Sequence, residues 1–205
     1  MPARFQLLAA HPALDFVNTL DNRFATSGPT ELLLGFADLV AFADQSALLN
    51  TRQVAALRKQ SRSAPAAKAL ARARALREVL SSVFYGIAQK GRPPSDSLKR
   101  MQEECLIARS HQQLIWTPSV ADDDGQPRGD WVWASSEDAT ELPMWAVAES
   151  AANLLTSRAV NRVHECGSPT CRWLFLDTSK NHTRRWCDMT ICGNRMKARR
   201  FHSRQ

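Results

Sequence analysis

Apolar residues recur at intervals of three and four along most of residues 1–160, which is the spacing of one buried face on an α-helix. Breaks in this pattern fall at the Gly28-Pro29 and Pro93-Pro94 pairs, which are residue types that separate helices. This part of the chain should therefore be helical, with a buried core of its own. The predicted helical segments are residues 14–20, 32–49, 53–60, 66–89, 95–110 and 141–157.

Two short stretches interrupt the helical pattern. Residues 113–117 and 130–134 are rich in aromatic and β-branched side chains, and the polar segment between them predicts a β-hairpin with a long loop. Alternation along the second strand places Trp131 and Trp133 on one face. We expect this face to cover the helical core. The alternative is an aromatic wall of a small-ligand site.

The pattern changes again near residue 160. Residues 173–176 predict one short strand, and the residues from Asn194 onward permit a short basic helix. The predicted fold class is α+β. A mostly helical domain with a small hairpin, residues 1–160, should precede a small cysteine-rich module, residues 161–205.

Four cysteines carry the clearest chemistry of the chain. Cys166 and Cys171 form one pair and Cys187 and Cys192 another, each with four intervening residues, while Cys105 stands alone. Two such loops facing each other make a tetrahedral S4 cage, the geometry of a structural zinc site. Four protein ligands leave no position for water, so one zinc ion should stabilise the fold without catalysing a reaction. A module this small depends on its metal, and chelation should unfold it while the helical domain stays intact.

The alternative for the four cysteines is two disulfides. The chain begins without the apolar run of a signal peptide, and no apolar stretch is long enough to cross a membrane. We therefore expect a cytoplasmic protein with reduced thiols and no membrane partner. The sequence also lacks a Ser-His-Asp set, a Walker loop and a dinucleotide fingerprint, so no enzymatic activity is expected.

The net charge of +7 is concentrated at the end of the chain. From Val163 onward nine Lys and Arg residues stand against three acids, which gives this segment a net charge of +6. A basic patch on one small module is typical of a protein that binds a polyanion, although a solvated basic tail is the alternative. The expected nucleic-acid contacts are Arg184, Arg185, Asn194, Arg195, Lys197, Arg199, Arg200 and Arg204.

Duplex DNA is the favoured partner. Trp173 and Trp186, which could stack on unpaired RNA bases, are needed for the core of the module. An RNA-binding protein and a protein-interaction module remain the alternatives. Asn194 and Arg195 touch the last cysteine, so the competing interpretation for them is support of the zinc ligands.

The segment from Cys171 to Cys187, with the tetrapeptide Cys192-Gly193-Asn194-Arg195, closely resembles the CGNR zinc finger. The N-terminal stretch Leu-Asp-Phe-Val-Asn-Thr-Leu at residues 14–20, followed by Arg23, resembles the start of the ABATE domain, which usually precedes this finger. The resemblance implies a stress-induced transcriptional regulator. Its N-terminal domain would sense a signal or oligomerise, and its finger would bind DNA.

The N-terminal motif contains four polar residues beside an apolar face: Asp15, Asn18, Thr19 and Arg23. A sensor domain would need such residues to line a pocket for a small-molecule effector, and we name them as candidate ligand contacts. The alternative is that they cap the helix and pair with one another.

Overall fold

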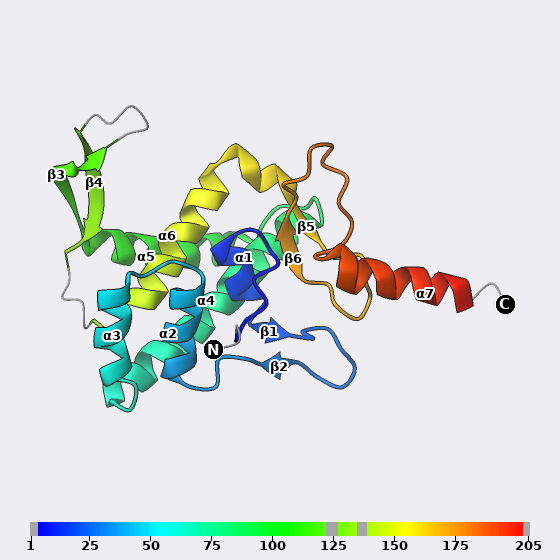
Figure 1. The fold of residues 1–205 in the computed structure, drawn as a ribbon, viewed down its shortest axis with the longest axis horizontal. Coiled ribbons are helices and arrows are strands. Elements are labelled where there is room, and N and C mark those ends of the chain that lie inside the picture. Colours follow the sequence, from blue (N-terminus) through cyan, green and yellow to red (C-terminus); the bar gives the residue numbers. More distant parts are fainter. Residues whose placement is uncertain (1–3, 122–126, 135–138, 203–205) are drawn as a thin grey trace.

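In the computed structural model, the long helix α4 (Ala64–Ala88) runs through the middle of the fold, and other helices pack around it (Figure 1). The neighbours of α4 are α1 (Pro12–Val17), α2 (Phe36–Gln45), α5 (Ser95–Ser110) and α6 (Leu142–Thr156). Helix α3 (Thr51–Lys59) packs against α2. The structure describes residues 4–121, 127–134 and 139–202, with side chains left out at 117–121, 127–128, 200 and 202. Across these ranges, none of the helices has the length and apolarity needed to span a membrane.

Local signals set most helix boundaries. Helix α4 starts where Ser63 Oγ accepts a hydrogen bond from the Ala66 N–H at 3.2 Å, a typical N-cap. Asn50 and Gln53 form a capping box at the start of α3. Helix α2 begins four residues later than predicted, because its N-cap is Gly35, whose N–H donates to the Asp38 carboxylate at 2.9 Å. The segment before it contains the strand β2 (Thr30–Glu31), which pairs with β1 (Leu20–Asp21).

The predicted hairpin is present, but it does not cover the core. Strands β3 (Gln112–Ala121) and β4 (Pro127–Trp133) pair antiparallel and project from the end of α5, away from the helices (Figure 1). The base of the hairpin reaches α6, where the Trp133 and Trp145 ring centroids lie 6.3 Å apart. Trp131 is 60% exposed, so the expectation held for Trp133 and was wrong for Trp131.

The C-terminal segment continues the core of the helices. After the turn η1 (Arg158–Arg162), strands β5 (Val163–Glu165) and β6 (Leu174–Leu176) pair antiparallel, with Val163 opposite Leu176. All of β6 is buried, and it packs against α1 and α4. The chain then passes through η2 (Met189–Gly193) into helix α7 (Asn194–His202), which points away from the body (Figure 1). The α+β fold class is confirmed.

Hydrogen bonds also join the two parts of the chain. The Asn18 side chain pairs with both backbone groups of Leu174, at 2.9 and 3.0 Å. Trp173 Nε1 donates to Asp21 at 2.7 Å, and Tyr85 Oη donates to the Arg172 carbonyl at 2.8 Å. The predicted boundary near residue 160 stays a prediction, but the residues on its two sides share one apolar cluster.

Candidate metal centre and nucleic-acid interface

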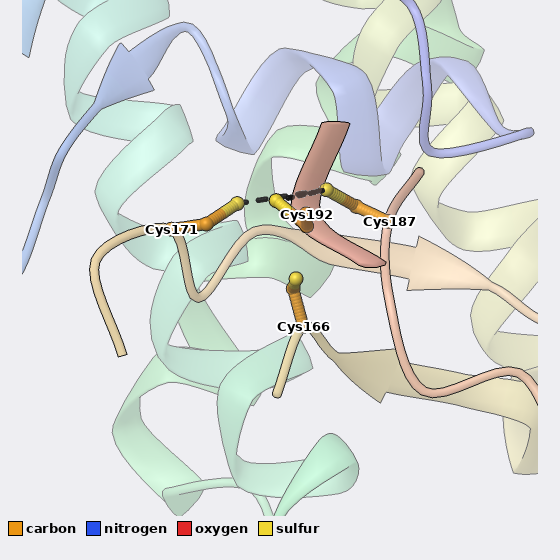
Figure 2. Close-up of side chains that lie close together, drawn as sticks. All are labelled: Cys166, Cys171, Cys187 and Cys192. Carbon is orange, nitrogen blue, oxygen red and sulfur yellow. Dashed lines mark hydrogen bonds between the residues drawn. The ribbon is translucent and has the colours of Figure 1, made fainter. Parts of the chain in front are cut away.

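The four cysteines of the two predicted pairs converge on one point (Figure 2). Their sulfur atoms all lie within 4.8 Å of one another, with Cys171 Sγ 3.5 Å and Cys192 Sγ 3.7 Å from Cys187 Sγ. A tetrahedral zinc with bonds of about 2.3 Å holds its sulfurs about 3.8 Å apart, so the donor set fits the metal. Cys105 lies elsewhere, near the Ala148 carbonyl. The protein therefore has a site for one structural zinc ion.

The first pair sits on a turn that follows β5. The Cys166 N–H donates to the Trp173 carbonyl at 2.8 Å, which continues the β5–β6 ladder to the first ligand. The Ser168 carbonyl then accepts from the N–H groups of Cys171 and Arg172, at 3.0 and 3.1 Å. Arg172 takes a left-handed conformation, with φ of 57°, which turns the chain back toward β6.

The second pair is held by Asp188. Its carboxylate accepts from the Ile191 N–H at 2.8 Å, and its carbonyl accepts from the N–H groups of Cys192 and Gly193, at 3.0 and 3.1 Å. Sequence reasoning missed this residue, although an aspartate three positions before the residue that donates to it is a common N-cap signal. Gly193 follows the last ligand with a φ that is not positive, and a Cβ there would lie 2.6 Å from Met189 Sδ, so close side-chain packing explains the glycine.

The sulfur cluster accommodates one negative charge and opposes further ones. Hydrogen bonds from the Cys171 and Cys187 thiols lower the pKa of Cys166. The same hydrogen bonds raise the pKa of Cys171 and Cys187, because each donates its proton to the Cys166 thiolate. Four ionised sulfurs this close require a cation among them, which is the electrostatic contribution of zinc.

Arg184 has a structural role that the sequence did not predict. Its guanidinium donates to the carbonyls of Trp186, at 2.8 Å, and Cys187, and it lies over the Phe175 ring, 4.7 Å from the centroid. A third bond reaches the Leu8 carbonyl at 3.3 Å. Arg184 therefore holds the metal loop onto β6 and the N-terminal segment, and its phosphate contact stays a prediction. A single sequence cannot distinguish this arginine from its exposed neighbour Arg185.

The other predicted nucleic-acid contacts lie on the surface. Arg185, Asn194, Lys197 and Arg199 are exposed, and the described residues offer no carboxylate partner to the three basic ones. The Arg195 side chain is exposed too, and it donates to Thr170 Oγ1 at 3.3 Å, which links the second cysteine turn to the first. Only the backbone of Arg200 is described, and Arg204 lies outside the described residues.

The four polar residues of the N-terminal motif have partners inside the protein, so the expected ligand pocket is not built from them. Asp15 accepts from the Ala9 N–H at 2.9 Å, and Asn18 holds β6 as described above. Thr19 Oγ1 donates to the Phe16 carbonyl and accepts from a buried arginine of α4. Arg23 pairs with Glu78 of the same helix. The alternative interpretation, capping and mutual pairing, is not what the structure shows either, because each of the four residues bonds to a residue outside the motif or to the backbone of α1.

Two family models match the chain. Residues 10–158 match ABATE, described as "Putative stress-induced transcription regulator", and residues 162–205 match the CGNR zinc finger. No curated protein matches the chain.

Proposed function

The chain belongs to the ABATE family of transcription regulators, and we propose that it regulates transcription by binding duplex DNA with its zinc module. The observation that carries the proposal is helix α7, which begins two residues after the last zinc ligand and extends away from the body (Figure 1). The zinc site and the Arg195–Thr170 contact fix the start of this helix, and the helix then extends away from the body, as a helix that enters a groove would (Figure 1).

The charge distribution on α7 suits a helix that lies in a groove between two phosphate backbones. Arg195 and Arg199 are one turn apart on one flank, and Lys197 lies on the roughly opposite flank. A helix on a flat anionic surface needs basic residues on one side only. The major groove, about 12 Å wide, admits an α-helix and presents phosphates on both sides. Exposed Arg185 lies on the metal loop and adds positive charge beside the start of the helix.

A second candidate is single-stranded RNA. Phe201 on α7 is 63% exposed, and an exposed aromatic ring near basic residues can stack on an unpaired base. The two tryptophans of the module are partly or fully buried and therefore give no such platform. We favour duplex DNA because one ring is fewer than single-strand binders commonly use.

The zinc-loaded full chain should be tested by selection from a random duplex library, with total cellular RNA as competitor. We expect enrichment of duplex sequences. For about four phosphate contacts the slope of log K against log salt should be about −3.6. Failure to bind either nucleic acid more tightly than about 10⁻⁴ M in moderate salt would contradict the proposal.

Arg184 and Arg185 provide a matched pair of variants because they are adjacent but differ in environment. Arg185→Ala should make the salt slope shallower by about 0.9 and leave zinc binding unchanged. Arg184→Ala should keep the slope but weaken zinc retention, because it removes donors from the Cys187 and Trp186 carbonyls. Equal effects of the two substitutions on the slope would show that Arg184 contacts phosphate after all.

The proposal includes no catalytic step, because four protein sulfurs fill the zinc coordination sphere. It also includes no effector, since the four candidate effector residues have hydrogen-bond or ion-pair partners within the protein. Zinc ligation by reduced thiolates supports a cytoplasmic location, and the description of the matching family supports a role in stress response.

A further inference from the structure

One face of the projecting hairpin is apolar and uncovered. Leu114 lies opposite Trp131, and Trp116 lies opposite Gly129, so these four residues point to the same side. Leu114, Trp116 and Trp131 are 64%, 73% and 60% exposed. A Cβ added at Gly129 would lie 3.5 Å from Leu114 Cδ1 and 3.8 Å from Trp116 Cε3, so both side chains spread over the glycine. We call these four residues the hairpin face.

A hollow lies at the base of the same face. It has a volume of about 210 Å³ and is lined by Arg109, Gln112, Trp131 and Glu149. Gln112 is on the hairpin face side of β3, two residues before Leu114. The Arg109 guanidinium pairs with Glu149 at 3.3 Å at the edge of the hollow and is more than half exposed. The hollow therefore combines an indole wall with an accessible cation.

We propose that the hairpin face is the contact surface of a symmetric homodimer, in which the partner's Trp116 fills this hollow. The hairpin carries a protruding indole about midway along β3 and a hollow at its base, on one face. When two such hairpins lie antiparallel across a two-fold axis near Leu114, each Trp116 meets the base of the other hairpin. Gln112 and Trp116 are four residues apart, so indole and hollow are separated by about 14 Å along the strand.

The chemistry of the hollow suits an indole. A tryptophan ring is the best aromatic partner for a guanidinium, and Arg109 lies where an entering ring would contact it. Trp131 offers a second ring for an offset or edge contact. Because the same residues serve both copies, the interface is self-complementary, as a two-fold contact requires.

The exposed area is sufficient for a dimer of moderate affinity. A tryptophan buries about 150–250 Å², so the exposed parts of the three apolar side chains amount to about 350 Å² per chain. Two copies would bury about 700 Å² of apolar surface. If about 60% of the buried area is apolar, the total interface is about 1,200 Å². That value is at the lower limit for stable interfaces, which corresponds to association at micromolar concentrations. The hairpin and α7 lie at opposite ends of the molecule, so the dimer would leave both α7 helices free (Figure 1).

Sedimentation equilibrium of the zinc-loaded full chain, from about 1 to about 200 µM without nucleic acid, tests the proposal independently of DNA binding. The wild type should approach twice the mass of one chain. Trp116→Ala should weaken association by about 30-fold or more, as expected for a central aromatic anchor, and Arg109→Ala by about 5-fold. Leu34→Ala, at a leucine that is 71% exposed away from the hairpin, is the matched control and should associate like the wild type.

Two results would overturn the proposal. One is a wild type that stays monomeric throughout this range, which would leave the hairpin face to a different protein or a small molecule. The other is a Trp116→Ala variant that associates as tightly as the wild type, which would place a dimer contact elsewhere. Because Trp116 is exposed, its replacement should leave the circular dichroism spectrum unchanged, and this measurement confirms that the variant is folded.

Discussion

Replacing Asn18 by alanine should remove the hydrogen bonds that join the zinc module to α1 and so lower the stability of both parts of the chain. Asn18 is 4% exposed, its Nδ2 donates to the Leu174 carbonyl at 2.9 Å, and its Oδ1 accepts from the Leu174 N–H at 3.0 Å. The substitution leaves two buried backbone groups without partners, and each unpaired group costs about 1–3 kcal/mol. The expected loss is therefore about 2–6 kcal/mol. This is a large part of the roughly 5–15 kcal/mol that stabilises a typical domain.

Urea unfolding with zinc in excess measures this loss. Helical circular dichroism follows the helices and tryptophan fluorescence follows the module, and both midpoints should fall together in Asn18→Ala. Asn18→Asp should be at least as unstable, because aspartate cannot donate to the Leu174 carbonyl and brings a buried charge. Asn161→Ala, at an exposed asparagine, should change the stability by less than about 0.5 kcal/mol. A similarly small change in Asn18→Ala would refute the reasoning.

Two further predictions concern the contact between β6 and the N-terminal residues. Because β6 packs in one core with α1 and α4, chelation of zinc should also lower the unfolding midpoint of the helical signal. The sequence predicted instead that the helical domain would stay intact, and an unchanged midpoint would support that earlier prediction. Burial raises the pKa of Asp15 to about 7, so its contribution to stability is fully present below about pH 4 and is lost as pH rises to 7. As pH rises from 5 to 8, the unfolding free energy of Asp15→Asn should therefore increase by about 2.7 kcal/mol relative to that of the wild type. Urea unfolding at each pH measures this difference, and a difference that does not change with pH would contradict the prediction.

The features that could be predicted from sequence are those set by neighbouring residues. Helix α4 and the zinc ligands were correct because helical spacing, caps and paired cysteines are all local patterns. The start of α2 was wrong because the apolar spacing continues through residues 32–33, whereas the helix begins only after Gly35, which bonds to the Asp38 carboxylate. Trp131 and Trp133 follow the same alternation, and only the position of α6 decides which of them is buried.

The role of the polar N-terminal motif follows from its position beside β6. The residues of β6 alternate: Phe175 faces β5 in the ladder, while the backbone groups of Leu174 and Leu176 face the other way. Asn18 satisfies both groups of Leu174, and the Ala9 carbonyl accepts from the Leu176 N–H at 2.8 Å. An unpaired edge of a buried strand would be costly, so the N-terminal motif serves as the missing neighbour of β6.

This arrangement also explains Asp15. Its carboxylate holds the Ala9 N–H at 2.9 Å, which positions the Ala9 carbonyl for Leu176. The preceding carbonyl, of Leu8, accepts from Arg184, which in turn holds the carbonyl of the zinc ligand Cys187. A chain of hydrogen bonds thus runs from the first helix to the metal loop through two backbone units. The zinc module is therefore oriented by the N-terminal motif as well as by its metal, and the direction of α7 depends on both.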